Sequence, residues 1–171
     1  MKLQTLLAAG VVAAGTATAG AHITLETPEA KVGSTYKAVL RVGHGCEGSP
    51  TLKVRVKIPE GVIAVKPMPK AGWDLETVTG PYGRSYDYYG TPLHEGVTEI
   101  VWTGRLADEH YDEFVFRGRL TDDLPVGEVL YFPAVQECEV GVERWIEIPE
   151  AGKAADDYES PAPGVTLLPK D

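Results

Sequence analysis

The sequence lacks the long apolar runs of membrane proteins and the sequence motifs of several common enzyme classes. Its 171 residues include two cysteines, two methionines and four histidines. After residue 14 there is no apolar run near the roughly 20 residues that a spanning helix needs, and there is no internal repeat. The chain has no serine, histidine and aspartate arrangement of the hydrolase type, no phosphate-binding glycine loop and no zinc signature. These absences predict a soluble protein that is not an enzyme.

Positive charge is also scarce. The chain carries 16 lysines and arginines against 25 aspartates and glutamates, a formal net charge of −9. Such a surplus of negative charge repels nucleic acid and anionic lipid. We therefore expect no nucleic-acid partner and no stable membrane anchor.

The first 21 residues have the three parts of a secretory signal peptide. Lys2 gives a positive start, residues 3–14 form an apolar stretch, and residues 19–21, Ala-Gly-Ala, form an A-x-A cleavage site. A second A-x-A site at residues 17–19 competes with it and would leave Gly20 as the first residue. We favour the cut after Ala21, which predicts a periplasmic protein that starts at His22.

A histidine at the amino terminus can hold one metal ion with two nitrogens, its α-amine and its ring Nδ1. The α-amine has an ordinary pKa of about 7.7–8.0, so it loses its proton at little cost near neutral pH. Copper leads the divalent ions in affinity for nitrogen and oxygen ligands. A chain that starts at Gly20 would instead bind Cu(II) or Ni(II) in a square plane, through its amine, two backbone amides and the His22 ring. Both cuts therefore predict copper at His22.

A further ligand is expected from the carboxylates that follow His22. Glu26 lies four residues on, so it would share the face of His22 on a straight strand. Glu29 comes directly after Pro28, which interrupts a regular strand and can bend the chain back towards the terminus. The residues alone leave both carboxylates open as ligands.

The two cysteines, Cys46 and Cys138, are predicted to form a disulfide, as an even pair in an exported protein usually does. Closing such a long loop stabilises a fold by about 4–5 kcal/mol in the chain-entropy model. The alternative is a thiolate site for Cu(I) made by His44 and Cys46. Oxidising surroundings favour the disulfide.

Short alternating segments separated by glycine and proline dominate the chain. Residues 51–58 alternate apolar and polar side chains, and further strands are expected at 36–42, 62–66, 74–78, 98–103, 112–120, 128–135 and 142–148. About seven to nine short strands without a clear helix predict an all-β, antiparallel, immunoglobulin-like sandwich. We expect this domain over residues 22–149, a long loop over 82–96, and a flexible tail over 150–171, where Ala, Asp, Pro and Gly prevail.

Trp145 departs from the pattern of its predicted strand. The apolar Val142, Ile146 and Ile148 share one parity, so Trp145 is expected on the polar face with two glutamates. A tryptophan there either caps the edge of the sandwich or shields a surface metal from water. The other histidines, His44, His94 and His110, are each candidates for a second imidazole, although no motif demands one.

Several segments, in this order, make the chain resemble the YcnI-like family of exported copper-binding proteins. They are His22-Ile23-Thr24-Leu25 with Pro28-Glu29-Ala30, residues 51–62 (TLKVRVKIPEGV), Ala71-Gly72-Trp73, Val101-Trp102-Thr103-Gly104, Asp112-Glu113-Phe114 and Trp145. The segment at residues 44–51, HGCEGSPT, is similar to that of a cysteine-bearing branch of the family.

The resemblance implies a sandwich domain that binds one Cu(II) per chain through a single-histidine brace. Carried over by motif, the amine and Nδ1 of His22 and the carboxylate of Glu29 are the ligands, and Trp145 lies close by. The expected function is copper trafficking or homeostasis, with other periplasmic copper carriers or copper importers as partners. The alternatives are a copper-dependent oxidative enzyme acting on a polymer and a metal-free sandwich binding module.

Overall fold

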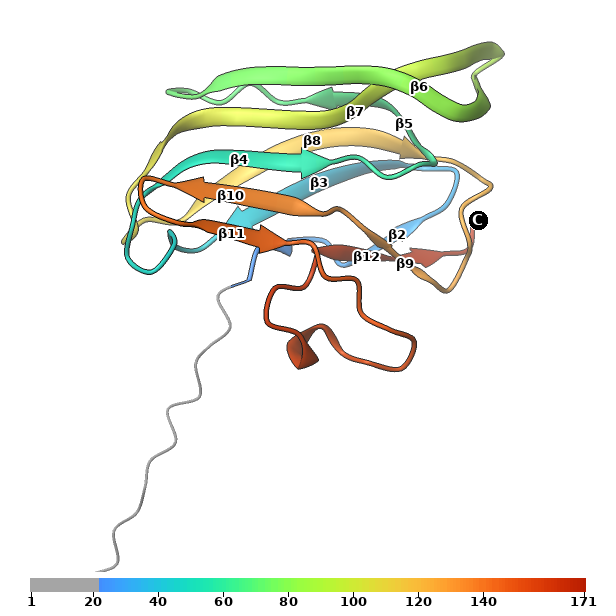
Figure 1. Cartoon of the computed structure of the whole chain (residues 1–171). Coiled ribbons are helices and arrows are strands. Elements are labelled where there is room, and N and C mark those ends of the chain that lie inside the picture. The colour runs from blue at the N-terminus through green and yellow to red at the C-terminus, as the bar shows by residue number, and fades with distance from the viewer. Residues whose placement is uncertain (1–21) are drawn as a thin grey trace, which may run out of the picture.

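The computed structural model describes residues 22–171. The predicted signal peptide, residues 1–21, and with it the choice of cleavage site, lies outside the described residues. The described chain folds into two antiparallel sheets that face each other, with a small third sheet at one end (Figure 1). Within residues 22–171 there is no helix that could span a lipid bilayer.

The first sheet has four strands in the order β1-β3-β8-β5. The central strands are long and pair over their whole length, whereas β1 adds two residues at one edge. The bounds are β1 (Thr24–Leu25), β3 (Thr35–Val42), β8 (Asp112–Leu120) and β5 (Val62–Pro67).

The second sheet has five strands in the order β11-β10-β4-β7-β6. Its bounds are β11 (Val142–Trp145), β10 (Ala134–Cys138), β4 (Thr51–Lys57), β7 (Thr91–Leu106) and β6 (Asp74–Tyr88). The two sheets enclose one core, in which the largest buried side chains are Trp102, Phe114, Phe116 and Phe132. In β4 the side chains of Val54 and Val56 enter this core, as the alternation of the sequence predicts.

The prediction of an all-β, immunoglobulin-like sandwich is confirmed, but residues 22–171 form twelve strands rather than seven to nine. Several of the extra strands have only two or three residues, which is too short for a period of two to be visible. The expected loop over residues 82–96 is wrong, because β6 and β7 continue through it as a long hairpin that pairs Tyr88 with Thr91. The tyrosines and glycines there suit an exposed two-stranded ribbon that needs little apolar area.

The third sheet corrects the expectation of a flexible tail over residues 150–171. It joins β2 (Glu29–Lys31), β12 (Gly164–Leu168) and β9 (Val129–Tyr131), with β12 in the middle. The side chains of Val165 and Leu167 are buried in the main core. The strand was missed because it is short and lies in a segment rich in Ala, Asp, Pro and Gly. Two inward side chains are enough to anchor it when strands on both sides satisfy its backbone hydrogen bonds. The domain therefore continues past residue 149, whereas residues 146–163 form an excursion with one 3-10 turn (η1, Ala155–Asp157).

This arrangement predicts that β12 is needed for stability. Replacing Leu167, which is 1% exposed, by alanine is expected to lower the free energy of unfolding by about 2–5 kcal/mol, because it leaves a cavity in the core. The matched control is Leu168→Ala at the half-buried neighbour, where the loss should be clearly smaller. Urea unfolding followed by fluorescence measures both, and a loss of about 0.5 kcal/mol or less for Leu167→Ala, as for a surface substitution, would show that β12 does not contribute to the core.

Candidate functional site

His22 lies where the edges of the two main sheets meet. It lies two residues before β1 and is half-buried. Its ring packs against the indole of Trp145 at the end of β11, with ring centroids 5.6 Å apart and planes tilted by 59°. In Figure 1 the first described residues accordingly lie beside β11. The structure thus brings together two of the residues that the sequence singled out, although 123 positions separate them along the chain.

Trp145 is buried, which corrects the expectation that it faces the polar side. Its side chain is 5% exposed, whereas Val142 and Ile146 on the other parity are 46% and 45% exposed. Trp145 lies opposite Ala134 in β10, and its indole N–H donates a hydrogen bond to Oε1 of Gln136 at 3.2 Å. A buried indole needs a partner for its N–H, and this partner makes the inward position favourable.

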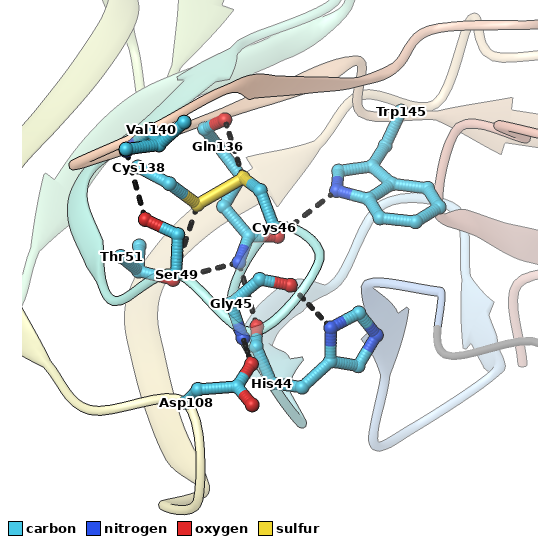
Figure 2. The surroundings of a disulfide bond; sticks show 10 residues. All are labelled: His44, Gly45, Cys46, Ser49, Thr51, Asp108, Gln136, Cys138, Val140 and Trp145. Carbon is cyan, nitrogen blue, oxygen red and sulfur yellow. Dashed lines mark hydrogen bonds between the residues drawn. A yellow bond between two sulfur atoms is a disulfide. The ribbon is translucent and has the colours of Figure 1, made fainter.

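Gln136 is a residue of the site that the sequence analysis missed. It is 1% exposed, and its amide nitrogen donates to the backbone oxygen of His44 and to Oγ1 of Thr51, each at 2.7 Å. One buried amide thereby makes hydrogen bonds to both the His44 backbone and the Trp145 indole (Figure 2). The His22 ring packs against that indole. The available signal was its parity, because Gln136 shares the inward face of β10 with Ala134.

The disulfide between Cys46 and Cys138 is confirmed, with its Cα atoms 5.9 Å apart. It fastens the loop that follows β3 to the end of β10 (Figure 2). Because both sulfur atoms are bonded to each other, the alternative thiolate site for Cu(I) at His44 and Cys46 does not fit this structure.

The loop that contains His44 is held by further hydrogen bonds. The N–H of Gly45 donates to Oδ1 of Asp108 at 2.9 Å, and Cys46 and Ser49 exchange two backbone hydrogen bonds at 3.0 and 2.9 Å. Gly45 has no room for a side chain, since a Cβ there would lie 1.7 Å from the backbone oxygen of Ser49. The loop therefore has one defined conformation, in which His44 is half-buried.

The other two candidate histidines are exposed. His94 lies in β7 near the tip of the β6–β7 hairpin, and His110 lies between β7 and β8. Neither has an aromatic neighbour of the kind that His22 has among the ring contacts of the described residues.

Only one of the two candidate carboxylates lies in a strand. Glu26 follows β1, where its N–H donates to the backbone oxygen of Val39 at 3.0 Å. Partial burial, a hydrogen bond to Glu113 and the charges of Glu113 and Glu26 raise the pKa of Tyr111, so Glu26 lies near Tyr111. Glu29 is the first residue of β2, opposite Thr166 of the parallel strand β12. Both residues are exposed.

The side chains of residues 22–171 could form a copper site only together with a main-chain nitrogen. Residues 22–171 contain no cluster of three His, Cys, Asp or Glu side chains close enough to hold a metal ion. A site at His22 therefore needs the α-amine that cleavage after Ala21 would create. That amine and the His22 imidazole would supply two nitrogens, and a carboxylate such as Glu26 or Glu29 would add an oxygen, a donor set of the type that Cu(II) prefers.

Comparisons with known proteins agree with the fold. A family model described as "Domain of unknown function (DUF1775)" matches residues 22–167. The chain is also similar to a solved structure described as an uncharacterized protein from Nocardia farcinica that reveals an immunoglobulin-like fold. The identity is 25% and the TM-score 0.59, over 86% of this chain and 98% of that one. Among curated proteins no significant match is found.

Proposed function

Because this chain belongs to the DUF1775 family, which is the YcnI-like family, we propose that it is an exported protein that binds one Cu(II). The ligands are the α-amine and Nδ1 of His22 and the carboxylate of Glu29, with Trp145 beside the metal. The protein acts in periplasmic copper trafficking or homeostasis, exchanging copper with other carriers or importers, and it is not an enzyme.

One observation carries this proposal, the packing of His22 on Trp145. Residue 22 is the first residue of the mature chain after the favoured cut, and the family match begins at the same position. Its ring rests on a buried indole that is fixed by Gln136, so the orientation of the imidazole is restrained before metal arrives. A restrained ligand loses less conformational freedom on binding, which favours affinity.

Trp145 gives a direct readout of the proposed site. A paramagnetic Cu(II) ion bound at His22 is expected to quench the fluorescence of the indole that its ring contacts. Trp145→Phe should remove most of the copper-dependent quenching, while Trp73 and Trp102 remain as the other emitters. Saturation at one equivalent supports one copper per chain, whereas no quenching and no shift of the melting temperature would support a metal-free binding module. Copper at 100 times its Kd should stabilise the fold by about 2.7 kcal/mol.

The choice of carboxylate is tested with a matched pair of variants. Glu29→Gln should weaken Cu(II) binding at least about tenfold, equivalent to about 1.4 kcal/mol, because it removes a charged ligand and keeps the size of the side chain. Glu26→Gln removes the same charge from the same segment and should have the smaller effect. Competition titration with a chromophoric chelator, on protein shown by intact mass to start at His22, measures both. If Glu26→Gln has the larger effect, Glu26 is the ligand.

A further inference from the structure

We propose that the outer face of the first sheet binds an acidic segment of a partner protein, in which carboxylates alternate with apolar side chains. The site consists of three cations in line, Lys37, Arg117 and Lys66, which we call the basic row, and of the apolar groove beside them. It shares no residue with the metal site proposed at His22, so the two proposals can fail separately.

The basic row crosses three neighbouring strands. Arg117 of β8 lies opposite Lys37 of β3 on one side and opposite Lys66 of β5 on the other. All three residues are exposed. Tyr36 and Phe116, which have the opposite parity, belong to the main core, so the row lies on the outer face of the sheet. Because neighbouring strands are about 4.8 Å apart, the row spans about 10 Å.

A bulge in β5 brings the third cation into the row. The register of β5 against β8 shifts by one residue between Ile63 and Lys66. Without this shift Val65 would lie opposite Arg117, whereas in the structure Val65 is part of the main core. Ala64, within the bulge, has a φ of 50°, a left-handed conformation that is costly for a residue other than glycine. Bulges often redirect a side chain in this way, and here the redirected side chain is a lysine.

No carboxylate of residues 22–171 forms an ion pair with the basic row. The carboxylates near the two ends of β8, Asp112 and Asp122, are paired with Lys70 and Lys170 instead. Like charges directly opposite each other destabilise a sheet. The row is therefore a local positive charge without compensation, on a chain whose net charge is −9. An acidic partner would supply the missing negative charge.

An apolar groove runs beside the basic row. Val115 of β8 lies opposite Val39 of β3, and the N–H of Met68, directly after β5, donates to the backbone oxygen of Val115 at 2.8 Å. The groove has a volume of about 330 Å³, and its apolar wall includes Pro67, Met68, Pro69 and Val115. Met68 is 52% exposed. The site thus offers both positive charge and apolar surface.

This arrangement suits an extended segment laid along the boundary between the row and the groove. Successive side chains of an extended chain point to opposite sides, so one set would face the cations and the other the groove. Side chains on one side repeat about every 7 Å, so two carboxylates fit within the span of the row. A nucleic acid or an anionic membrane extends well beyond the row and would be repelled by the rest of this negatively charged chain.

The experiment uses protein starting at His22 and, as the probe, a fluorescein-labelled peptide of three Glu-Val repeats. Fluorescence anisotropy at about 20 mM and about 150 mM salt should show binding that is tighter at the lower salt. The triple variant Lys37→Gln, Lys66→Gln and Arg117→Gln should weaken this binding about tenfold or more. Its melting temperature should equal or exceed that of the unmodified protein, because the substitutions remove repulsion across the strands.

Two controls test the charge and the groove separately. Lys57→Gln, Arg144→Gln and Lys153→Gln together change the net charge by the same amount at exposed positions elsewhere, and should leave the Kd within about twofold. Met68→Gln should weaken the binding of the Glu-Val peptide and leave that of a Glu-Ser peptide unchanged, because only the valines reach the groove.

Three results would overturn the proposal. The first is equal weakening by the two triple variants, which would show attraction by net charge alone. The second is no binding of the Glu-Val peptide at about 1 mM and low salt. The third is row-dependent binding of phosphatidylglycerol vesicles without binding of the peptide, which would assign this face to a membrane surface.

Discussion

Acetylating the α-amine of His22 is expected to lower the affinity for Cu(II) by about 100-fold or more, equivalent to about 2.7 kcal/mol. The acetyl group removes the lone pair of the amine and opens the chelate ring, while every side chain stays in place. The α-amine can be modified selectively near pH 6.5, since lysine amines have pKa values about 2.5 units higher and remain protonated there. Isothermal titration calorimetry on the two forms measures the difference.

Two comparisons make this result decisive. Protein that starts at Gly20 should still bind Cu(II), with a square-planar spectrum made by two backbone amides, because histidine is then the third residue. Affinity should also fall as the pH is lowered, since protons compete for the same nitrogens. Unchanged binding by acetylated protein would show that the amine is not a ligand and would contradict the proposed site.

Replacing both Cys46 and Cys138 by serine should lower the free energy of unfolding by about 4–5 kcal/mol. The disulfide joins residues 92 positions apart, so its removal returns a large loop entropy to the unfolded chain. The serines add no large side chain, and the cavity that they leave is small. Urea unfolding of the oxidised protein and of the double variant gives the difference, and the double variant should also show a larger m-value, because its unfolded state is less compact.

Reduced unmodified protein is the control for this prediction. It should match the double serine variant, because it lacks the same cross-link and keeps the sulfur atoms. A loss below about 1 kcal/mol in both would show that the fold does not depend on this bond.

Much of the fold could be predicted because alternation and turn residues are local properties. The inward Val54 and Val56 of β4 show this well. The disulfide could be predicted because only one pairing of two cysteines exists. Contacts between distant segments could not be predicted from local pattern, and β12 is the clearest case, since its partners β2 and β9 lie far away in sequence.

In the site, too, local pattern could select single residues but could not predict the contacts between distant segments. His22 and Trp145 could be selected one by one, from the cleavage pattern and from the unusual parity, and the resemblance connected them. The orientation of Trp145 could not be predicted, because it depends on Gln136, a polar side chain that the hydrophobic pattern disregards. A buried amide is favourable only when its partners are present, and those partners lie on three other segments of the chain.

The parallel pairing of β2 with β12 constrains the order in which the strands can form. Glu29 begins a strand whose neighbour lies far along the chain, since Thr166, 137 positions later, lies opposite it. During biosynthesis, β2 can therefore not reach this pairing until β12 has been made. In the proposed site, the carboxylate of Glu29 therefore takes up its place only after β12 has joined the sheet.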